Sequence, residues 1–446
     1  MNQGREQGPL DVEKRMFGKL PEEEQEQRAT EAGTLDAAIL QHGNEQALRS
    51  IDQPEKELSA EDQERFEKML TGARNVIGAF QIQRSPDNKK GENLVIVTDT
   101  GADMLFIQSL YQAGRETAGA DCRVVVTEKP TGPAQPFSKV VDERLTNADC
   151  LLYVTSFSRS HSQGTVELIS PHPNEAVAQM KEARIKAGGG EFPTNARIIS
   201  ITQTRPEILT DGAAQENLEE MRVRLETIKE IMKDVESVHI TSENGTDLEL
   251  ATKEKRIVTD DGKMDARGKV ANFPFGEWSC AVNLDGTNGT LVVDGVSTIP
   301  VGELDQPITL KIGKGVVTDI QGGEAAERLR KALDEANAKW KEGHPDDTTT
   351  NAYRLAELGI GVNSKAFRYD SEGQRIAPPT SLEGEKGLGT IHIAIGKNTI
   401  FGVSPKDPDF NPPPVHIDNV IMATTVEARK KDGSKQNIIE QGQAKF

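Results

Sequence analysis

Cysteine and long apolar runs are both scarce in this sequence of 446 residues, and each scarcity excludes a class of protein. The three cysteines, Cys122, Cys150 and Cys280, form no C-x-x-C pair, which argues against a disulfide framework and against a thiolate zinc site. No stretch approaches the roughly 20 apolar residues of a membrane-spanning helix, and the N-terminus has no apolar signal segment. We therefore expect a cytoplasmic protein with no membrane partner.

Basic charge is also in deficit. The chain has 53 Lys and Arg residues against 71 Asp and Glu residues, so its net charge is −18 with neutral His. A protein that binds nucleic acid usually carries a basic patch that neutralises the phosphate backbone, and no Lys/Arg block is present here. We therefore expect no nucleic-acid partner.

The length allows roughly three domains at about 150 residues each. Residues 1–90 are predicted to form an acidic, partly helical N-terminal extension. Its most regular part is a helix expected at 60–80, where Ser59 could cap the first turn and Phe66, Met69 and Leu70 follow helical spacing.

Residues 91–240 have the pattern of an α/β domain. Short apolar runs bounded by polar turns alternate with helical stretches such as 102–118 and 211–234, which favours a parallel sheet covered by helices. The apolar runs lie at 93–99, 122–128, 149–156 and 196–202.

Residues 241–446 change character again and are predicted to form a mixed α+β domain. Asp-Gly and Asn-Gly pairs are typical turns between antiparallel strands, and one helix is expected at 323–341. These pairs stand at 261–262, 285–286, 288–289 and 294–295.

Four short segments of the last domain carry acidic or imidazole side chains in settings where a core would not need them. They are 272–277 (NFPFGE), 356–361 (AELGIG), 385–392 (EKGLGTIH) and 415–418 (VHID). In a strand over 390–396, alternation places His392 opposite the isoleucine face, and the same period puts His416 and Asp418 on one face of their strand. Each segment alone is weak, since a single strand His or a Glu beside a turn is more often structural.

Together the four segments offer a set of oxygen and nitrogen donors without thiolate, which suits Zn, Co or Mn. The set is Glu277, Glu357, His392, His416 and Asp418, with Glu385 as a further member. Because one divalent ion would not balance so many carboxylates, we expect two ions per chain that activate a water for hydrolysis. Glu277 and Glu357 are the candidates for catalytic roles.

At these segments the sequence resembles the thermophilic metalloaminopeptidases, a family that includes aminopeptidases T, S and II. The resemblance covers about 93–446. It implies an N-terminal α/β domain, a C-terminal domain with a dinuclear metal centre, a homodimer, and a peptide or small amide substrate that loses its N-terminal residue. By motif, Glu277 looks like the ligand after N-x-P, Glu357 like the bridging carboxylate, and His392, His416 and Asp418 like further ligands.

Two positions depart from that family. Better-known members have a ligand Glu five residues before the strand His and a catalytic Tyr seven after it, where this chain has Gly387 and Thr399. Glu385 could replace the missing Glu. The missing Tyr would stabilise a tetrahedral oxyanion, and the loss of one such donor can lower the rate by about 10²–10³.

Two further hypotheses therefore stay open. His392, His416 and Asp418 alone form the two-His, one-carboxylate set of mononuclear iron oxygenases, and the family has a ring-cleaving branch, the 2,5-dihydroxypyridine dioxygenases. We expect Glu277 and Glu357 to point at the ions in a hydrolase and away in such an oxygenase. The third hypothesis is a non-catalytic metal-binding or assembly protein.

Overall fold

The structure is a computed structural model. It describes residues 59–82, 92–118, 122–127, 148–156, 196–202, 204–252, 257–266, 269–369, 372, 375–376, 380–403 and 405–446. Most of the N-terminal extension predicted for residues 1–90 lies outside the described residues. Its helix is described and forms α3 (Ala60–Gly78).

The chain divides into two compact units. The first comprises Met1–Ser59, Ile82–Gln203 and Ala266–Val270, and the second comprises Ala60–Gln81, Thr204–Asp265 and Ala271–Phe446. The three domain ranges expected from the sequence stay a prediction.

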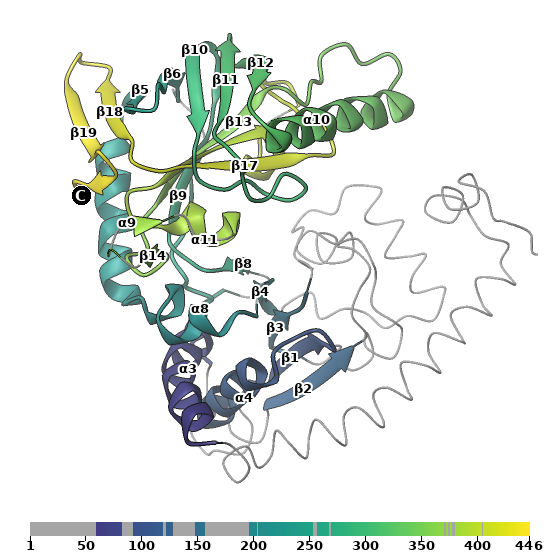
Figure 1. Ribbon diagram of the computed structural model, residues 1–446, viewed down its shortest axis with the longest axis vertical. Coiled ribbons are helices and arrows are strands. Elements are labelled where there is room, and N and C mark those ends of the chain that lie inside the picture. The colour runs from purple at the N-terminus through teal and green to yellow at the C-terminus, as the bar shows by residue number, and fades with distance from the viewer. Residues whose placement is uncertain are drawn as a thin grey trace, which may run out of the picture. The chain divides into compact units, whose positions relative to one another are not determined.

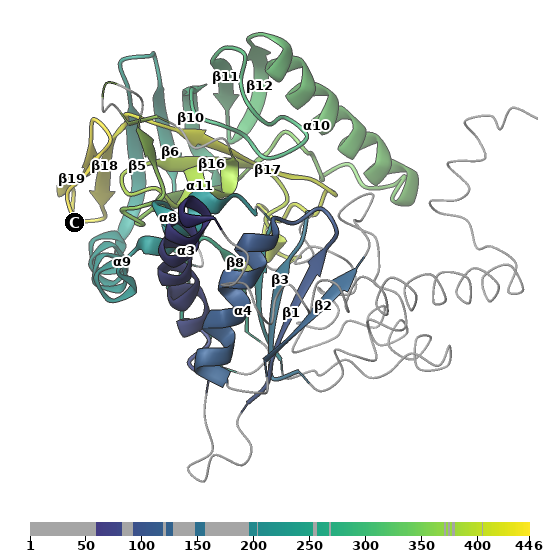
Figure 2. The same ribbon diagram turned by 60° about the horizontal axis from the view of Figure 1, so that its bottom comes forward.

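The first unit is built on a parallel sheet, which confirms the α/β class. Its strands are β1 (Leu94–Asp99), β2 (Cys122–Thr127), β3 (Cys150–Val154) and β4 (Arg197–Ile201), in the order β2-β1-β3-β4. A further strand, β8 (Val270–Phe273), begins at the last residue of this unit. β1 pairs in parallel with β2 and β3, and β3 with β4. Helix α4 (Met104–Ala118) packs on β1 and β2 (Figure 2).

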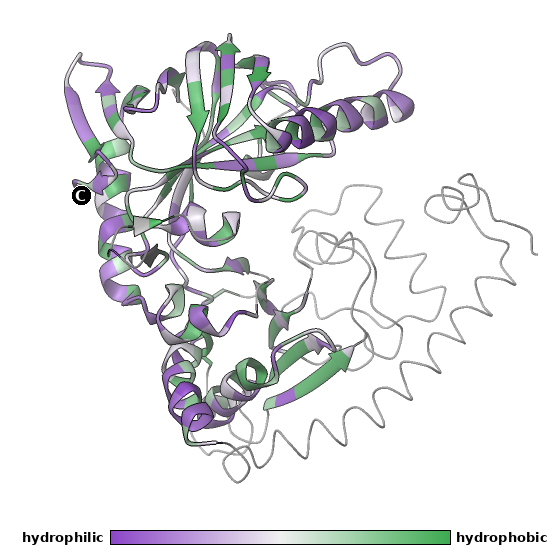
Figure 3. Cartoon of the chain, in the orientation of Figure 1, coloured by the Kyte–Doolittle hydropathy of each residue, from purple (hydrophilic) through white to green (hydrophobic). Residues whose placement is uncertain are grey.

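The core of this unit follows from strands that are apolar along their whole length. β1, β3 and β4 are buried at every residue, as expected when both faces of a parallel sheet are covered. Figure 3 shows β1 and β2 in the hydrophobic colour along most of their length. The buried cluster contains Val95, Val97, Val125, Ala148, Leu151, Tyr153, Ala196 and Ile198.

The second unit contains the remaining described helices and two large antiparallel sheets (Figure 1). The helices are α3, α8 (Pro206–Thr210), η3 (Ala213–Gln215), α9 (Leu218–Met232), α10 (Glu324–Gly343), α11 (Ser381–Lys386) and η4 (Thr399–Phe401). Among the described residues, no helix combines the length and the apolar character needed to cross a membrane.

The larger sheet has eight strands in the order β12-β11-β10-β6-β5-β18-β19-β20. Their bounds are β5 (Val235–Thr241), β6 (Asp247–Ala251), β10 (Asn283–Val293), β11 (Ile308–Gly313), β12 (Val316–Gln321), β18 (Thr425–Lys430), β19 (Lys435–Glu440) and β20 (Gln443–Ala444). α10, close to the predicted 323–341, packs on β12 (Figure 1).

One sequence prediction for this sheet is wrong. The pairs Asp285-Gly286 and Asn288-Gly289 do not separate strands but lie inside the long strand β10. The pairing register of β10 with β6 shifts between Asn283 and Asn288, so the glycines form an irregularity within the strand. A Cβ on Gly289 would lie 2.2 Å from the carbonyl oxygen of Asp247, which explains why a glycine is needed there.

The second sheet has five strands in the order β17-β16-β13-β9-β7. They are β7 (Ile257–Asp260), β9 (Glu277–Ala281), β13 (Leu355–Gly361), β16 (Ile391–Gly396) and β17 (His416–Ile421), and a separate pair joins β14 (Arg368–Tyr369) to β15 (Arg375–Ile376). All four segments with candidate ligands belong to this sheet or directly precede it. The sheet is therefore the scaffold on which a functional site would be built.

The packing of α3 on α8 gives a test of the fold. A Cβ on Gly72 would lie 2.3 Å from the carbonyl oxygen of Leu209, whereas a Cβ on Gly78 would meet no described atom within 4 Å. We expect Gly72→Ala to force the two helices apart and to lower the free energy of unfolding by about 1–3 kcal/mol. Gly78→Ala, in the same helix, should raise it by up to about 1 kcal/mol through helix propensity. Urea denaturation checks both values, and equal effects would contradict this packing.

Candidate metal centre

Five of the six predicted site residues lie on one face of the five-stranded sheet. They come from four adjacent strands: Glu277 from β9, Glu357 from β13, His392 from β16, and His416 and Asp418 from β17. Four sequence segments that lie up to 141 residues apart are thus brought together by strand pairing alone.

The register explains why these side chains meet. Glu357 pairs with Ala394, and Ala394 pairs with Asp418, so the two acids flank a small residue in one row of the sheet. His392 pairs with Gly359 in the next row. Since side chains alternate along each strand, all of these residues point to the same face.

Glycine at position 359 makes room for the imidazole of His392. A Cβ on Gly359 would lie only 1.9 Å from Cε1 of the His392 ring. Gly361, two residues further on the same face, pairs with Glu277, and its Cβ would lie 2.2 Å from the carbonyl oxygen of Gly387. The Glu-x-Gly-x-Gly spacing therefore supplies one acid and two gaps on a single face.

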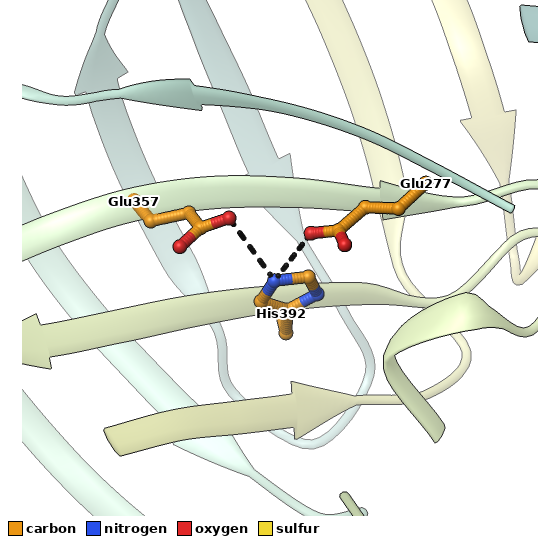
Figure 4. A group of neighbouring side chains, drawn as sticks. All are labelled: Glu277, Glu357 and His392. Carbon is orange, nitrogen blue, oxygen red and sulfur yellow. Dashed lines mark ion pairs between the residues drawn. The ribbon is translucent and has the colours of Figure 1, made fainter. Parts of the chain in front are cut away.

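The donor atoms form two groups that share Glu357. In the inner group, His392 Nε2 lies 3.1 Å from Glu277 Oε1 and 3.5 Å from Glu357 Oε1, and both carboxylates point at the ring (Figure 4). In the outer group, His416 Nε2 lies 3.1 Å from Glu357 Oε2 and 3.0 Å from Asp418 Oδ1. Each group is compact enough to hold a metal ion.

The two groups differ in their access to solvent. The His392 and Glu277 side chains of the inner group are 2% and 12% exposed, whereas those of His416 and Asp418 in the outer group are 23% and 16% exposed. The shared Glu357 is 5% exposed. A small molecule would therefore reach this centre from the side of β17.

Lys386 is a member of the site that the predicted set left out. Its side chain is buried at the end of α11, donates to Glu277 Oε2, and lies 3.5 Å from Glu385 Oε2. Burial opposes the charge of this lysine, but Glu277 and Glu385 raise its pKa above the usual range. Burial likewise opposes the charge of Glu277, and Lys386 and His392 hold its pKa well below the usual range.

Glu385, the sixth predicted ligand, is placed differently from the other five. It is buried on α11 and belongs to neither compact group. Burial, together with the negative charge of Asp418, raises the pKa of Glu385 to about 7. A carboxyl group with such a pKa can exchange a proton near neutral pH. Gly387 and Thr399 occupy the positions where the aminopeptidases have Glu and Tyr, and Thr399 begins η4.

The site fits a bound cation. His416 Nδ1 lies 2.6 Å from the carbonyl oxygen of Lys397, and as a donor to it the ring directs the lone pair of Nε2 toward Glu357 and Asp418. Three acceptor atoms that face one another require a proton or a metal ion between them. This tether to a backbone carbonyl is also the usual second contact of a metal-binding histidine. In the described part of the chain, His392 Nδ1 and Asp418 Oδ1 are buried without a hydrogen-bond partner.

Comparison with known proteins identifies the family. A family model for 2,5-dihydroxypyridine 5,6-dioxygenase (NicX) matches residues 77–428. The 2,5-dihydroxypyridine 5,6-dioxygenase of Pseudomonas putida KT2440 is 28% identical over 181 residues, which is 39% of this chain and 46% of that protein. The alignment thus spans about half the length of this curated relative.

Two solved structures share the fold. The 2,5-dihydroxypyridine dioxygenase of Pseudomonas putida KT2440 superposes with a TM-score of 0.57 and 19% identity, covering 84% of this chain and 96% of that one. Wild-type AmpT from Thermus thermophilus gives 0.55 and 14%, covering 85% and 100%. At these identities the likeness concerns the fold alone, and in that respect the resemblance to the aminopeptidases is confirmed.

The prediction that this protein is an aminopeptidase, and therefore a hydrolase and a protease, is wrong. The family model and the curated relative both point to the ring-cleaving branch that the sequence left as an alternative. The orientation of the two glutamates also differs from what we expected of an oxygenase. Glu277 and Glu357 point toward His392 rather than away from the site, although the family is one of oxygenases (Figure 4). A glutamate bound to a buried lysine can point inward without a second ion. The match over residues 77–428 shows that the chain belongs to the NicX family of 2,5-dihydroxypyridine 5,6-dioxygenases, which are enzymes.

Proposed function

We propose that this protein is an iron-dependent dioxygenase that opens the ring of a dihydroxylated pyridine. The observation that carries the proposal is a two-His, carboxylate donor set within a chain that matches the NicX model over residues 77–428. Such a set, with open positions for substrate and oxygen, is typical of non-haem iron(II) oxygenases. The substrate class comes from the name of the family and of its relative in Pseudomonas putida.

A single divalent ion per chain accounts for the charge of the site. Glu277, Glu357 and Asp418 contribute three negative charges, and the ammonium of Lys386 already balances one of them at Glu277. One divalent ion balances the remaining two when Glu385, whose pKa is raised to about 7, is protonated. In this proposal the ammonium of Lys386 takes the place of the second of the two ions expected from the sequence. Donors would come from His392, His416, Asp418 and Glu357.

Bound iron(II) supplies the one-electron chemistry that allows dioxygen to react with an aromatic ring. The chain itself orients the donors. Lys397 fixes the His416 ring through its backbone carbonyl, and the gap at Gly359 fixes His392. Glu385, buried next to Lys386 with its pKa raised to about 7, can hold a proton at neutral pH. A homodimer and the lack of nucleic-acid or membrane partners stay predictions.

The activity can be measured directly. Apoprotein loaded anaerobically with iron(II) should consume dioxygen when 2,5-dihydroxypyridine is added, with loss of the ring's ultraviolet absorbance and incorporation of both atoms of ¹⁸O₂ into the product. Loss of a residue that only supports a metal ligand typically costs about 10–100-fold. His416→Ala removes a proposed ligand itself, so it should lower the rate by more than that. His239→Ala is the matched control, because His239 forms an exposed pair with Asp247 on the other sheet.

Other outcomes of this assay have definite meanings. An iron-loaded protein that turns over no hydroxylated pyridine would contradict the proposal. Well under one metal ion per chain, together with no turnover, would favour the non-catalytic hypothesis.

Metal content gives a second, independent test. Elemental analysis of protein loaded with excess iron(II) and then desalted anaerobically should return one ion per chain, because Lys386 occupies the neighbourhood of Glu277. Two ions per chain would show that the lysine does not take the place of a second cation.

The gap beside His392 gives a third test. Gly359→Ala should displace the imidazole and weaken iron(II) binding, since the added Cβ would lie 1.9 Å from the ring. Gly313→Ala is the matched strand control, because its Cβ would meet Thr318 Cγ2 at 3.7 Å, an ordinary contact. Isothermal titration with iron(II) under nitrogen compares the two variants. Unchanged binding by Gly359→Ala would mean that His392 is not a donor.

A further inference from the structure

A short segment covers the outer edge of β17, the last strand of the five-stranded sheet. Gly295 donates its backbone N–H to the carbonyl of Val420 over 3.0 Å, and Val420 donates to Val296 over 2.9 Å. Ser297 forms a bridge with Asn419 and donates its hydroxyl to Asn419 Oδ1 over 2.9 Å. The segment therefore runs along the edge of β17, from Val420 to Asn419 and on toward Asp418.

Thr298, the next residue, makes three hydrogen bonds with Asp418. Its backbone N–H donates to the Asp418 carbonyl over 3.0 Å. Its hydroxyl accepts from the Asp418 N–H over 3.1 Å and donates to Asp418 Oδ2 over 3.2 Å. Because the hydroxyl accepts from one group and donates to the other, its orientation is fixed by Asp418 alone.

These contacts separate the two oxygens of the Asp418 carboxylate. Oδ2 is bonded to Thr298, whereas Oδ1 lies 3.0 Å from His416 Nε2 and has no hydrogen-bond partner in the described part of the chain. We propose that Thr298 is a positioning residue that makes Asp418 offer a single oxygen, Oδ1, to the metal ion. The inference rests on the metal site proposed above.

The rest of the turn is anchored so that Thr298 stays in place. Arg328 of α10 donates to the carbonyl of Val301 over 2.8 Å and to that of Glu303 over 2.8 Å. Val301 N–H also donates to the Thr298 carbonyl over 3.0 Å. Threonine is β-branched and stiff at χ1, so its hydroxyl is held with little loss of freedom. Ile299, by contrast, is 81% exposed and points away from these contacts.

The experiment measures metal binding rather than turnover. Cobalt(II), which gives visible absorption bands that report its coordination, is titrated into apoprotein of the wild type, Thr298→Val, Thr298→Ser and Ile299→Ala. Thr298→Val keeps the shape but loses the hydroxyl, so it should bind cobalt about 10–100-fold more weakly and shift the bands. Thr298→Ser restores the hydroxyl and should bind close to the wild type. Ile299→Ala, the neighbouring control, should be unchanged.

Each alternative result has a consequence. Cobalt affinity and bands unchanged in Thr298→Val would overturn the inference, even if its melting temperature falls, because a purely structural role predicts that pattern. Equal losses in Thr298→Val and Thr298→Ser would also overturn it. A wild type that binds no cobalt would instead remove the metal site itself and the proposed function with it.

Discussion

The concentration of negative charge on one buried face of a sheet is the constraint on which the C-terminal half of this protein depends. The three carboxylates of the two donor groups meet there, and the Glu357 side chain is only 5% exposed. Removing charged groups from water is costly unless opposite charges and hydrogen bonds compensate. The buried ammonium of Lys386 supplies one such charge, and the tethered ring of His416 leaves a place for a cation between acceptor atoms.

Much of this arrangement could be predicted from the sequence because it follows from strand periodicity. A strand with isoleucines on one face leaves His392 on the other, and the i, i+2 spacing of His416 and Asp418 puts both on one side. The parallel strands were equally visible as short apolar runs. The parts that were missed depend on contacts between distant segments. Nothing near Lys386 in the sequence indicates that it meets Glu277, 109 residues earlier.

The wrong choice of reaction has a physical explanation. The donor set reports which cations can bind, and a set of carboxylates and imidazoles suits both hydrolytic and redox metals. Fold likeness does not separate them either, since AmpT and the dihydroxypyridine dioxygenase superpose almost equally well. The informative signal was that Gly387 and Thr399 stand where the aminopeptidases have a ligand Glu and a catalytic Tyr. A chain without the ligand Glu and the oxyanion Tyr of the peptidases lacks groups specific to their chemistry, while keeping those needed to hold an ion.

Lys386 connects the charge of the site with that choice. A hydrolase with two ions needs cations in both groups, so that a water can be held between them. Here the buried ammonium of Lys386 is bonded to Glu277 Oε2, while Glu277 Oε1 faces His392. A second ion would therefore meet a carboxylate whose charge is already compensated. In the proposed function, Lys386 compensates Glu277. The two histidines, Glu357 and Asp418 then remain to hold one ion, which ligands would reach from the side of β17. In the proposed function, this buried ammonium, carried by α11 next to Glu385, takes the place that a second metal ion has in a dinuclear hydrolase.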